Sequence, residues 1–377
     1  MRKQISLQLL AGIMAISLTA CGGAASSSES STSSASSTGS AEMSSSESET
    51  VSALSSAETA GESISSSGSS SSSSSAAANL AISDLKLDDV DMSNVKIGVV
   101  MKSSDEFQNS VVEGAKDAFL EAGGSESNFK NVASTSESDA MQQVTAIEDM
   151  VSNNIDILLC SCQEENTLKG TLQAAADAGV KVVMVDTDCA SLTDKVTYIG
   201  TDNYQAAYDG AKEFAKRLEK GTNVVILRGK LGDVNHEDRT EGLQTALEEA
   251  GMKVLEVQDA NCETDKAANI MEQFISKYDD IGAVMVTSDS MAVGAAQAIK
   301  GAGVEGIKIC GFDGFQSAIQ LVETGEIEMI IGQKPYQIGY DGVVCGLGSM
   351  TGQSYDDYIN PGIQIIDQDN YKDFLKE

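Results

Sequence analysis

The stretch DILLCSCQEENTLKGTLQAAADAGVKVVMVDTD, residues 156–188, holds two short apolar runs separated by one longer amphipathic segment. The runs DILLC and KVVMV have the length and apolar content of buried strands. The segment between them, ENTLKGTLQAAADAG, has helical spacing and ends in a glycine that can terminate a helix. A strand, a helix and a second strand in this order predict parallel neighbours joined by a right-handed crossover.

The same alternation extends in both directions. Upstream, VKIGVVM and NFKNVAS are predicted strands, and EFQNSVVEGAKDAFLEAG and residues 139–151 are predicted helices. After VTYIGTDN the order begins again, with strands TNVVILRG, MKVLEVQ, GAVMVTSD, IKICGF, IEMIIGQ and a final GIQIID. We expect helices at 204–219, 238–250, 265–277, from 290, from 315 and at 336–350. The predicted fold class is α/β, with two similar doubly wound parallel-sheet lobes.

The N-terminal part of the chain has a different composition. Arg2 and Lys3 precede a mostly apolar stretch, 5–18, that is too short for a permanent membrane span and therefore indicates an export signal. The following LTAC resembles a lipobox, the bacterial lipoprotein cleavage signal, which implies a signal peptide at 1–20 and an acylated Cys21. An ordinary signal peptide with an accidental cysteine is the alternative. Residues 21–94, rich in Ser, Ala, Gly and Glu over most of their length, are predicted to form a disordered tether.

Charge and cysteine usage narrow the function further. The formal net charge of −32 argues against nucleic-acid binding and suits an exported soluble protein. Six cysteines remain after Cys21: Cys160, Cys162, Cys189, Cys262, Cys310 and Cys345. Most of them, namely Cys160, Cys162, Cys189 and Cys310, lie in or at the end of apolar runs. This favours buried thiols over a disulfide framework, with a Cys160–Cys162 redox or metal contact as the alternative. We expect no metal and no cofactor.

Polar residues follow the predicted strands at their carboxyl ends, where open parallel sheets bind ligands. They are Lys102, Ser103, Asp105, Cys162, Gln163, Asp186, Asp188, Arg228, Ser288, Asp289, Asp313 and Gln333. Because these side chains recur in both halves, the sequence predicts a cleft between two polar rims. Phe107 and Phe315 are the aromatic candidates near it, since the chain has no tryptophan.

The triplet Asp186-Thr187-Asp188 is compatible with several chemistries. A DxD phosphatase motif usually follows the first strand of its domain, whereas three strand–helix units come first here. A DxD glycosyltransferase needs an activated donor that is not expected outside the cell. A hydrolase with a carboxylate pair stays open, as does a solvated turn. The single histidine, His236, lies in the charged sequence NHEDR, which is typical of an exposed loop or a helix start.

Taken together, several stretches resemble the type 1 periplasmic sugar-binding proteins, such as ribose-binding proteins, over residues 95–366. The stretches are IGVVM, GAKDAF, VVMVDTD, YIGTDNYQAA, RTEGLQTAL, SDSMAVGAAQAI, GFDGFQSAI and GQKPYQIGYDGV. The resemblance implies an N-terminal lobe of 95–202 plus 334–362 and a C-terminal lobe of 203–333 plus 363–377. It also implies three hinge segments, near 200–203, 333–334 and 361–363.

The resemblance also implies site roles. Asp186 falls on the carboxylate that binds sugar hydroxyls, Arg239 on an arginine from the second lobe, Asp313 on a second carboxylate and Gln333 on a crossover glutamine. Three positions differ from the family: Thr187 replaces an arginine, Ser288 an asparagine and Lys102 a serine, while Asp289 is retained. The family's paired phenylalanines are reduced to Phe107 and Gln108, and Cys262 falls near another aromatic position of the family. The expected ligand contacts are Lys102, Asp105, Phe107, Asp186, Thr187, Asp188, Arg239, Ser288, Asp289, Asp313 and Gln333.

These observations predict a lipid-anchored, monomeric solute receptor on the extracellular face of the cell membrane, not an enzyme. It is expected to bind a sugar or related polyol and to deliver it to an ABC permease by hinge closure. Two alternatives remain: a sensory receptor of the same fold that feeds a sensor kinase, and an extracellular hydrolase that uses Asp186 and Asp313.

Overall fold

A computed structural model describes residues 80–134 and 140–375. All described residues belong to one compact unit of the chain. The signal peptide, Cys21 and the tether up to residue 79 lie outside the described residues. Across the described ranges, every helix is too short or too polar to cross a bilayer.

The first of two six-stranded sheets has the order β11-β5-β4-β3-β1-β2, and its paired strands are all parallel. Its strands are β1 (Ile97–Met101), β2 (Phe129–Ala133), β3 (Ile157–Cys160), β4 (Lys181–Val185), β5 (Thr197–Ile199) and β11 (Tyr358–Ile359). We call this sheet and its helices lobe 1. The register pairs Cys160 with Met184, so the residues that follow β3 and β4 emerge side by side.

The second sheet has the order β12-β10-β9-β8-β6-β7, and with its helices we call it lobe 2. Its strands are β6 (Asn223–Arg228), β7 (Lys253–Asp259), β8 (Ile281–Val286), β9 (Lys308–Asp313), β10 (Met329–Gly332) and β12 (Gln364–Asp367). Edge strand β12 runs antiparallel to β10, while the other pairs are parallel. The prediction of two parallel-sheet α/β lobes is confirmed.

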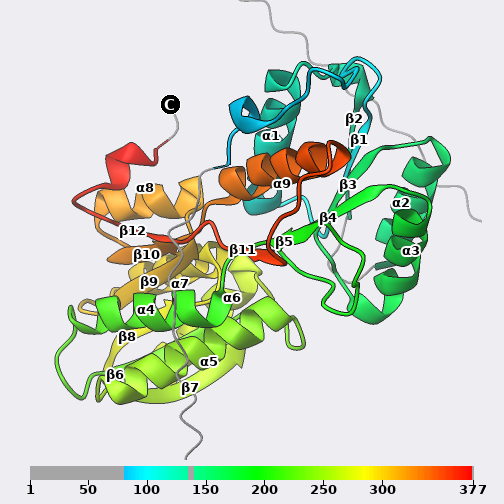
Figure 1. Cartoon of the computed structure of the whole chain (residues 1–377). Coiled ribbons are helices and arrows are strands. Elements are labelled where there is room, and N and C mark those ends of the chain that lie inside the picture. The colour runs from blue at the N-terminus through cyan, green and yellow to red at the C-terminus, as the bar shows by residue number, and fades with distance from the viewer. Residues whose placement is uncertain (1–79, 135–139, 376–377) are drawn as a thin grey trace, which may run out of the picture. The chain divides into compact units, whose positions relative to one another are not determined.

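Helices cover both faces of each sheet (Figure 1). In lobe 1, α1 (Glu106–Glu121) packs beside α9 (Pro335–Met350) on one face, and α2 (Ala140–Ser152) packs beside α3 (Glu165–Asp177) on the other. In lobe 2, one face carries α4 (Asn203–Ala215) and α5 (Val234–Glu249). The opposite face carries α6 (Thr264–Lys277), α7 (Asp289–Ala302) and α8 (Gln316–Thr324). Short 3₁₀ turns occupy Ile82–Asp84, Glu126–Asn128 and Tyr371–Asp373.

Glycines permit the close crossing of α1 and α9. A Cβ added to Gly339 would lie 1.8 Å from the Val111 carbonyl oxygen, and one added to Gly114 would lie 1.9 Å from the Tyr336 carbonyl oxygen. The two backbones are therefore in direct contact. This contact holds α9 in lobe 1, although the residues of most of lobe 2 lie between α1 and α9 in the sequence.

The chain passes between the sheets three times, at 200–202, 333–334 and 360–363. These crossings lie together, because Lys334 Nζ donates to the Pro361 carbonyl at 3.0 Å and the Tyr358 hydroxyl donates to the Gly200 carbonyl at 3.2 Å. They correspond to the three segments that the sequence suggested as links.

The structure differs from the sequence expectations at several boundaries. Helix α5 begins at Val234 rather than near 238, because the Asp233 side chain caps it by accepting from the Asn235 and His236 backbone N–H groups. Helix α4 ends at Ala215 rather than near 219. Residues 80–94, expected within the tether, pack on lobe 1, where Ile82 and Met92 are buried.

Candidate functional site

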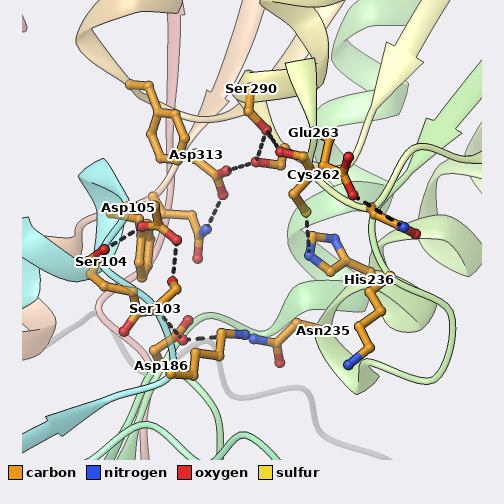
Figure 2. Close-up of a pocket in the computed structure, with 18 of the residues that line it drawn as sticks. Ser103, Ser104, Asp105, Asp186, Asn235, His236, Cys262, Glu263, Ser290 and Asp313 are labelled. Carbon is orange, nitrogen blue, oxygen red and sulfur yellow. Dashed lines mark hydrogen bonds and ion pairs between the residues drawn. The ribbon is translucent and has the colours of Figure 1, made fainter. Parts of the chain in front are cut away.

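A pocket of about 520 Å³ lies between the carboxyl ends of the two sheets (Figure 2). Lobe 1 lines it from the ends of β1, β2 and β4 and from α1. Lobe 2 lines it from the start of α5, the β7–α6 loop and the ends of β8 and β9. Eight of the eleven predicted contact residues line this pocket: Lys102, Asp105, Phe107, Asp186, Arg239, Ser288, Asp313 and Gln333.

Asp186 follows β4 directly and is 5% exposed. Its backbone has a φ of 62°, a left-handed conformation that costs free energy in a residue with a side chain. The carboxylate accepts from Gln108 Nε2 at 2.7 Å, Ser161 Oγ at 2.8 Å and Thr187 Oγ1 at 3.1 Å. All three bonds end on Oδ2, so Oδ1 is the oxygen that can accept from a hydroxyl of a bound molecule.

Asp313 ends β9 on the opposite side of the pocket, with a φ of 120°. Its Oδ1 accepts from Arg239 Nη1 at 2.9 Å and from Gln333 Nε2 at 2.6 Å, and its Oδ2 accepts from Ser288 Oγ at 2.8 Å. Burial raises the pKa of Asp313, and the Arg239 guanidinium opposes that rise. The carboxylate is therefore held in one position by three donors.

Arg239, on α5, is only 4% exposed and is fixed by several partners. Nε donates to Asn203 Oδ1 at 2.7 Å, and Nη1 donates to the Thr287 carbonyl at 2.8 Å as well as to Asp313. The guanidinium carbon lies 4.1 Å from the centroid of the Phe312 ring. This side chain is thus positioned in advance of ligand binding, which reduces the entropy lost when a ligand is bound.

Lys102 connects the two lobes. Its Nζ lies 3.3 Å from Asp233 Oδ2 in lobe 2 and 3.7 Å from Asp186 Oδ2 in lobe 1. Burial alone would raise the pKa of Asp233, but the charge of Lys102 and the other neighbouring groups hold it well below its usual range. A second cross-lobe bond runs from Asn235 Nδ2 to Thr187 Oγ1 at 3.0 Å. The pocket therefore lies between lobes that contact each other directly.

The structure does not bring three predicted contact residues to the pocket lining. The Thr187 hydroxyl donates to Asp186 Oδ2 and accepts from Asn235 Nδ2. Asp188 turns away and pairs with Lys195 at 2.8 Å within lobe 1. Asp289 is fully buried at the start of α7, where its Oδ2 accepts from the Gly314 and Phe315 backbone N–H groups at 2.7 and 2.8 Å. Asp289 thus holds the loop that follows Asp313.

Among the other strand-end residues, Ser103 and Phe315 line the pocket, whereas Arg228 pairs with Asp259 and Glu237 outside it. Cys162 is buried in the lobe 1 core, and the Gln163 backbone N–H donates to Gln143. In the described part of the chain, no group of three or more His, Cys, Asp or Glu side chains is arranged to hold a metal ion.

The expected ligand contacts did not include several residues that line the pocket, among them Gln108, Ser134, Asn235 and His236. Gln108 and Ser134 are each only 2% exposed. Within the described residues, Gln108 Oε1 and Ser134 Oγ are buried without a hydrogen-bond partner. A buried polar atom in a pocket wall is stabilised when a polar guest bonds to it. These two atoms therefore mark the wall as a surface for a molecule with hydrogen-bonding groups.

His236 is buried rather than exposed, although it does lie in the first turn of α5. Its Nδ1 is 2.9 Å from Thr287 Oγ1, and its Nε2 is 3.2 Å from Cys262 Sγ. Burial lowers the pKa of His236 to about 3, and the Arg239 charge adds to that effect. Recognising Asp233 as the cap would have placed Asn235 and His236 at a helix start beside the cleft.

Comparison with known proteins gives a consistent result. The family described as "Periplasmic binding protein domain" matches residues 97–353. A D-ribose/D-allose-binding protein of Pseudomonas aeruginosa is 29% identical over 69% of this chain and 83% of its own length. A ribose import binding protein of Salmonella typhimurium is 28% identical over 57% of this chain and 72% of its own length.

Two solved structures share this architecture. An ABC transporter solute-binding protein from Burkholderia graminis, in complex with D-arabinose, has a TM-score of 0.70 and 25% identity over 76% of this chain and 99% of that chain. A periplasmic solute-binding protein from Actinobacillus succinogenes with bound D-allose has a TM-score of 0.68 and 25% identity over 74% of this chain and 100% of that chain. The chain belongs to the type 1 periplasmic sugar-binding protein family, whose members are solute receptors of ABC transporters.

Proposed function

We propose that this chain is a lipid-anchored receptor on the outer face of the cell membrane that binds a sugar or related polyol and delivers it to an ABC permease. Relatives named for D-ribose and D-allose, and neighbours with bound D-arabinose and D-allose, support a monosaccharide-sized ligand. The lipobox-like LTAC at 18–21 supports the anchor. The receptor acts as a monomer and catalyses no reaction.

The observation that carries the proposal is the facing pair of buried carboxylates, Asp186 and Asp313, with Arg239 beside Asp313. Carboxylate oxygens accept from vicinal hydroxyls, and a guanidinium donates to ring and hydroxyl oxygens. The positions of all three groups are fixed by hydrogen bonds to protein atoms. Phe107 and Phe315 supply apolar surface for the C–H face of a sugar.

The three crossings between the sheets support a hinge mechanism. A ligand that bonds to Asp186 in lobe 1 and to Arg239 in lobe 2 has its full set of contacts only when the lobes are together. It therefore shifts the population toward the closed form, which the permease would recognise. The fixed hydrogen-bond networks make each lobe a rigid body during this motion.

The test is direct binding by the unit formed by residues 71–377. We expect calorimetry to show one-to-one binding of at least one compound from a panel of pentoses, hexoses and polyols, with no consumption of the ligand. The absence of binding across the panel would contradict the sugar assignment. Steady turnover of a glycoside would instead indicate a hydrolase that uses Asp186 and Asp313.

A second experiment separates transport from sensing. Deletion of the gene for this chain should abolish uptake of the identified ligand by intact cells, and a version carrying Cys21→Ala should be released from the membrane. Normal uptake in the deletion strain, together with loss of a transcriptional response to the ligand, would favour the sensory receptor.

A further inference from the structure

One cysteine differs from the others in its surroundings. Cys262 lies in the β7–α6 loop, is partly exposed and lines the pocket (Figure 2). The other five described cysteines are buried, and none of the six is in a disulfide. Cys262 has a backbone φ of 60°, so its loop holds the thiol in the pocket wall at some conformational cost.

The thiol is paired with an imidazole whose orientation is fixed. Cys262 Sγ lies 3.2 Å from His236 Nε2, and His236 Nδ1 lies 2.9 Å from Thr287 Oγ1. The ring also packs closely against Gly229, where an added Cβ would lie 2.5 Å from ring atoms. The imidazole therefore has close neighbours at both nitrogens and on one face.

The hydrogen bonds at Thr287 allow an arrangement in which the ring proton faces Cys262. The Thr287 hydroxyl accepts from the Gly229 backbone N–H at 2.9 Å and can at the same time donate its own proton to His236 Nδ1, which also lies 2.9 Å away. Burial keeps the imidazole neutral at physiological pH by lowering its pKa. The ring proton is then on Nε2 and points at Sγ, where it stabilises the thiolate more than the thiol.

The wall opposite supplies an independent sign that a polar guest enters this space. Gln108 Oε1 and Ser134 Oγ are buried atoms of the same pocket that have no hydrogen-bond partner among the described residues. A guest that satisfies them shares a volume of about 520 Å³ with the Cys262 thiol. A group attached to Sγ would occupy part of that volume, so modification and guest binding would exclude each other.

We propose that Cys262 is a thiol-modification site that exchanges with low-molecular-weight disulfides and thereby blocks the ligand pocket. The Cys262 thiolate attacks one sulfur of R–S–S–R, a new Sγ–S bond forms, and R–S⁻ leaves with the electron pair of the broken S–S bond. The proton released by Cys262 is taken up by the departing thiolate, so the exchange is balanced and needs no other oxidant. A second thiol reverses it.

The experiment uses the full chain and 2-hydroxyethyl disulfide, a small neutral probe. Peptide mapping by mass spectrometry gives the rate of adduct formation at each cysteine. We expect Cys262 to be modified at least about tenfold faster than Cys160, Cys162, Cys189, Cys310 and Cys345, because it alone of these combines exposure with a hydrogen-bond donor to the thiolate. Equal rates at the six cysteines, or faster reaction at a buried one, would overturn the proposal.

Two variants test the role of the pair. Cys262→Ser should remove the fast adduct and leave the slow ones unchanged. His236→Gln, checked for folding by thermal melting, should slow the reaction at Cys262 without altering the order of the other five. If the Cys262 rate is unchanged in a folded His236→Gln protein, the imidazole has no part in the reactivity.

A last measurement links the site to the pocket. The adduct should abolish binding of any sugar found to bind the unmodified protein, and dithiothreitol should restore it. That sugar, added first, should protect Cys262 from the probe. Full binding by the quantitatively modified protein would contradict the blocking role. The labelling order is measured without a sugar, so the site and the proposed receptor function can fail separately.

Discussion

Asp186 and Asp313 occupy corresponding positions in the two lobes. Asp186 follows β4 and Asp313 ends β9, and these strands hold the third place in the orders β11-β5-β4-β3-β1-β2 and β12-β10-β9-β8-β6-β7. Both residues have positive φ. Each carboxylate accepts from a serine beyond the next strand at 2.8 Å, Ser161 for Asp186 and Ser288 for Asp313. The two lobes therefore present the same arrangement to the pocket, a carboxylate at the end of the third strand that is held by a serine beyond the neighbouring strand.

Removal of the lobe 1 carboxylate should weaken binding. We expect Asp186→Ala to reduce affinity more than tenfold, which corresponds to about 1.4 kcal/mol or more, because Oδ1 then no longer accepts from the ligand. Calorimetry measures the change. Asp188→Ala is the matched control, since Asp188 pairs with Lys195 and does not line the pocket. A comparable loss in both variants would mean that the effect is not local to the pocket.

Arg239 should matter for folding as well as for binding. Arg239→Ala leaves Asp313 buried without its cation, and breaking such a pair costs about 3–5 kcal/mol. We expect weaker ligand binding and a lower free energy of unfolding, measured by chemical denaturation. The double variant Arg239→Ala/Asp313→Asn should recover part of the stability but not the binding. Equal stability of the single and double variants would show that the buried charge is not the cause.

The ion pair between Lys102 and Asp233 should favour the closed arrangement of the lobes. Asp233→Asn removes the charge but retains a residue that caps helices well, so α5 should stay intact. We expect a larger radius of gyration in small-angle scattering and weaker ligand binding. Lys195→Met, which breaks an ion pair within lobe 1, should leave the radius unchanged. An unaltered radius in Asp233→Asn would assign closure to other contacts.

His236 should make stability depend on pH in the acidic range. Its pKa is about 3 in the folded state against an ordinary value of 6.5, so between these values the unfolded chain binds more protons. Stability should therefore fall as pH falls below about 6.5, by at most about 1.4 kcal/mol per pH unit from this residue. Denaturation of wild type and His236→Gln at pH 5 and pH 7 measures the difference. Identical pH dependence in the two proteins would contradict the buried neutral imidazole.

The crossing of α1 and α9 should tolerate no side chain. Gly339→Ala places a methyl group against the Val111 carbonyl and should lower the free energy of unfolding by about 3 kcal/mol. Gly170, in α3, has open space around it, so Gly170→Ala should raise stability by about 0.5–1 kcal/mol. Thermal melts of the two variants should shift in opposite directions.

The alternation of apolar runs and amphipathic segments was enough to predict the two lobes, because parallel sheets require that order. The same rule placed Asp186 and Asp313 at strand ends. It could not predict that Asp186 lines the pocket and Asp188 does not. The direction of each side chain depends on the conformation of the loop after β4. Asp289 looked like a cleft residue for the same reason, but its carboxylate is taken up by backbone N–H groups.

Other parts of the site depend on long-range contacts. Lys102 meets Asp233, a residue 131 positions later, only through the arrangement of the two lobes. Ser134 carries no local signal, and Gln108 stood out only by its place beside Phe107 at the family's paired aromatic position; the importance of both side chains comes from burial in the pocket wall. The charged sequence NHEDR suggested exposure for His236, yet the ring is enclosed by Thr287, Gly229 and Cys262.

The packing of residues 80–94 on lobe 1 assigns unequal mechanical roles to the two halves. Any segment before residue 80 joins the fold through contacts such as those of Ile82 and Met92 with the lobe 1 core. A force applied to the chain on the N-terminal side of residue 80 would therefore act on lobe 1 first. That force would reach lobe 2 through the three crossings and through cross-lobe contacts such as Lys102 with Asp233 and Asn235 with Thr187.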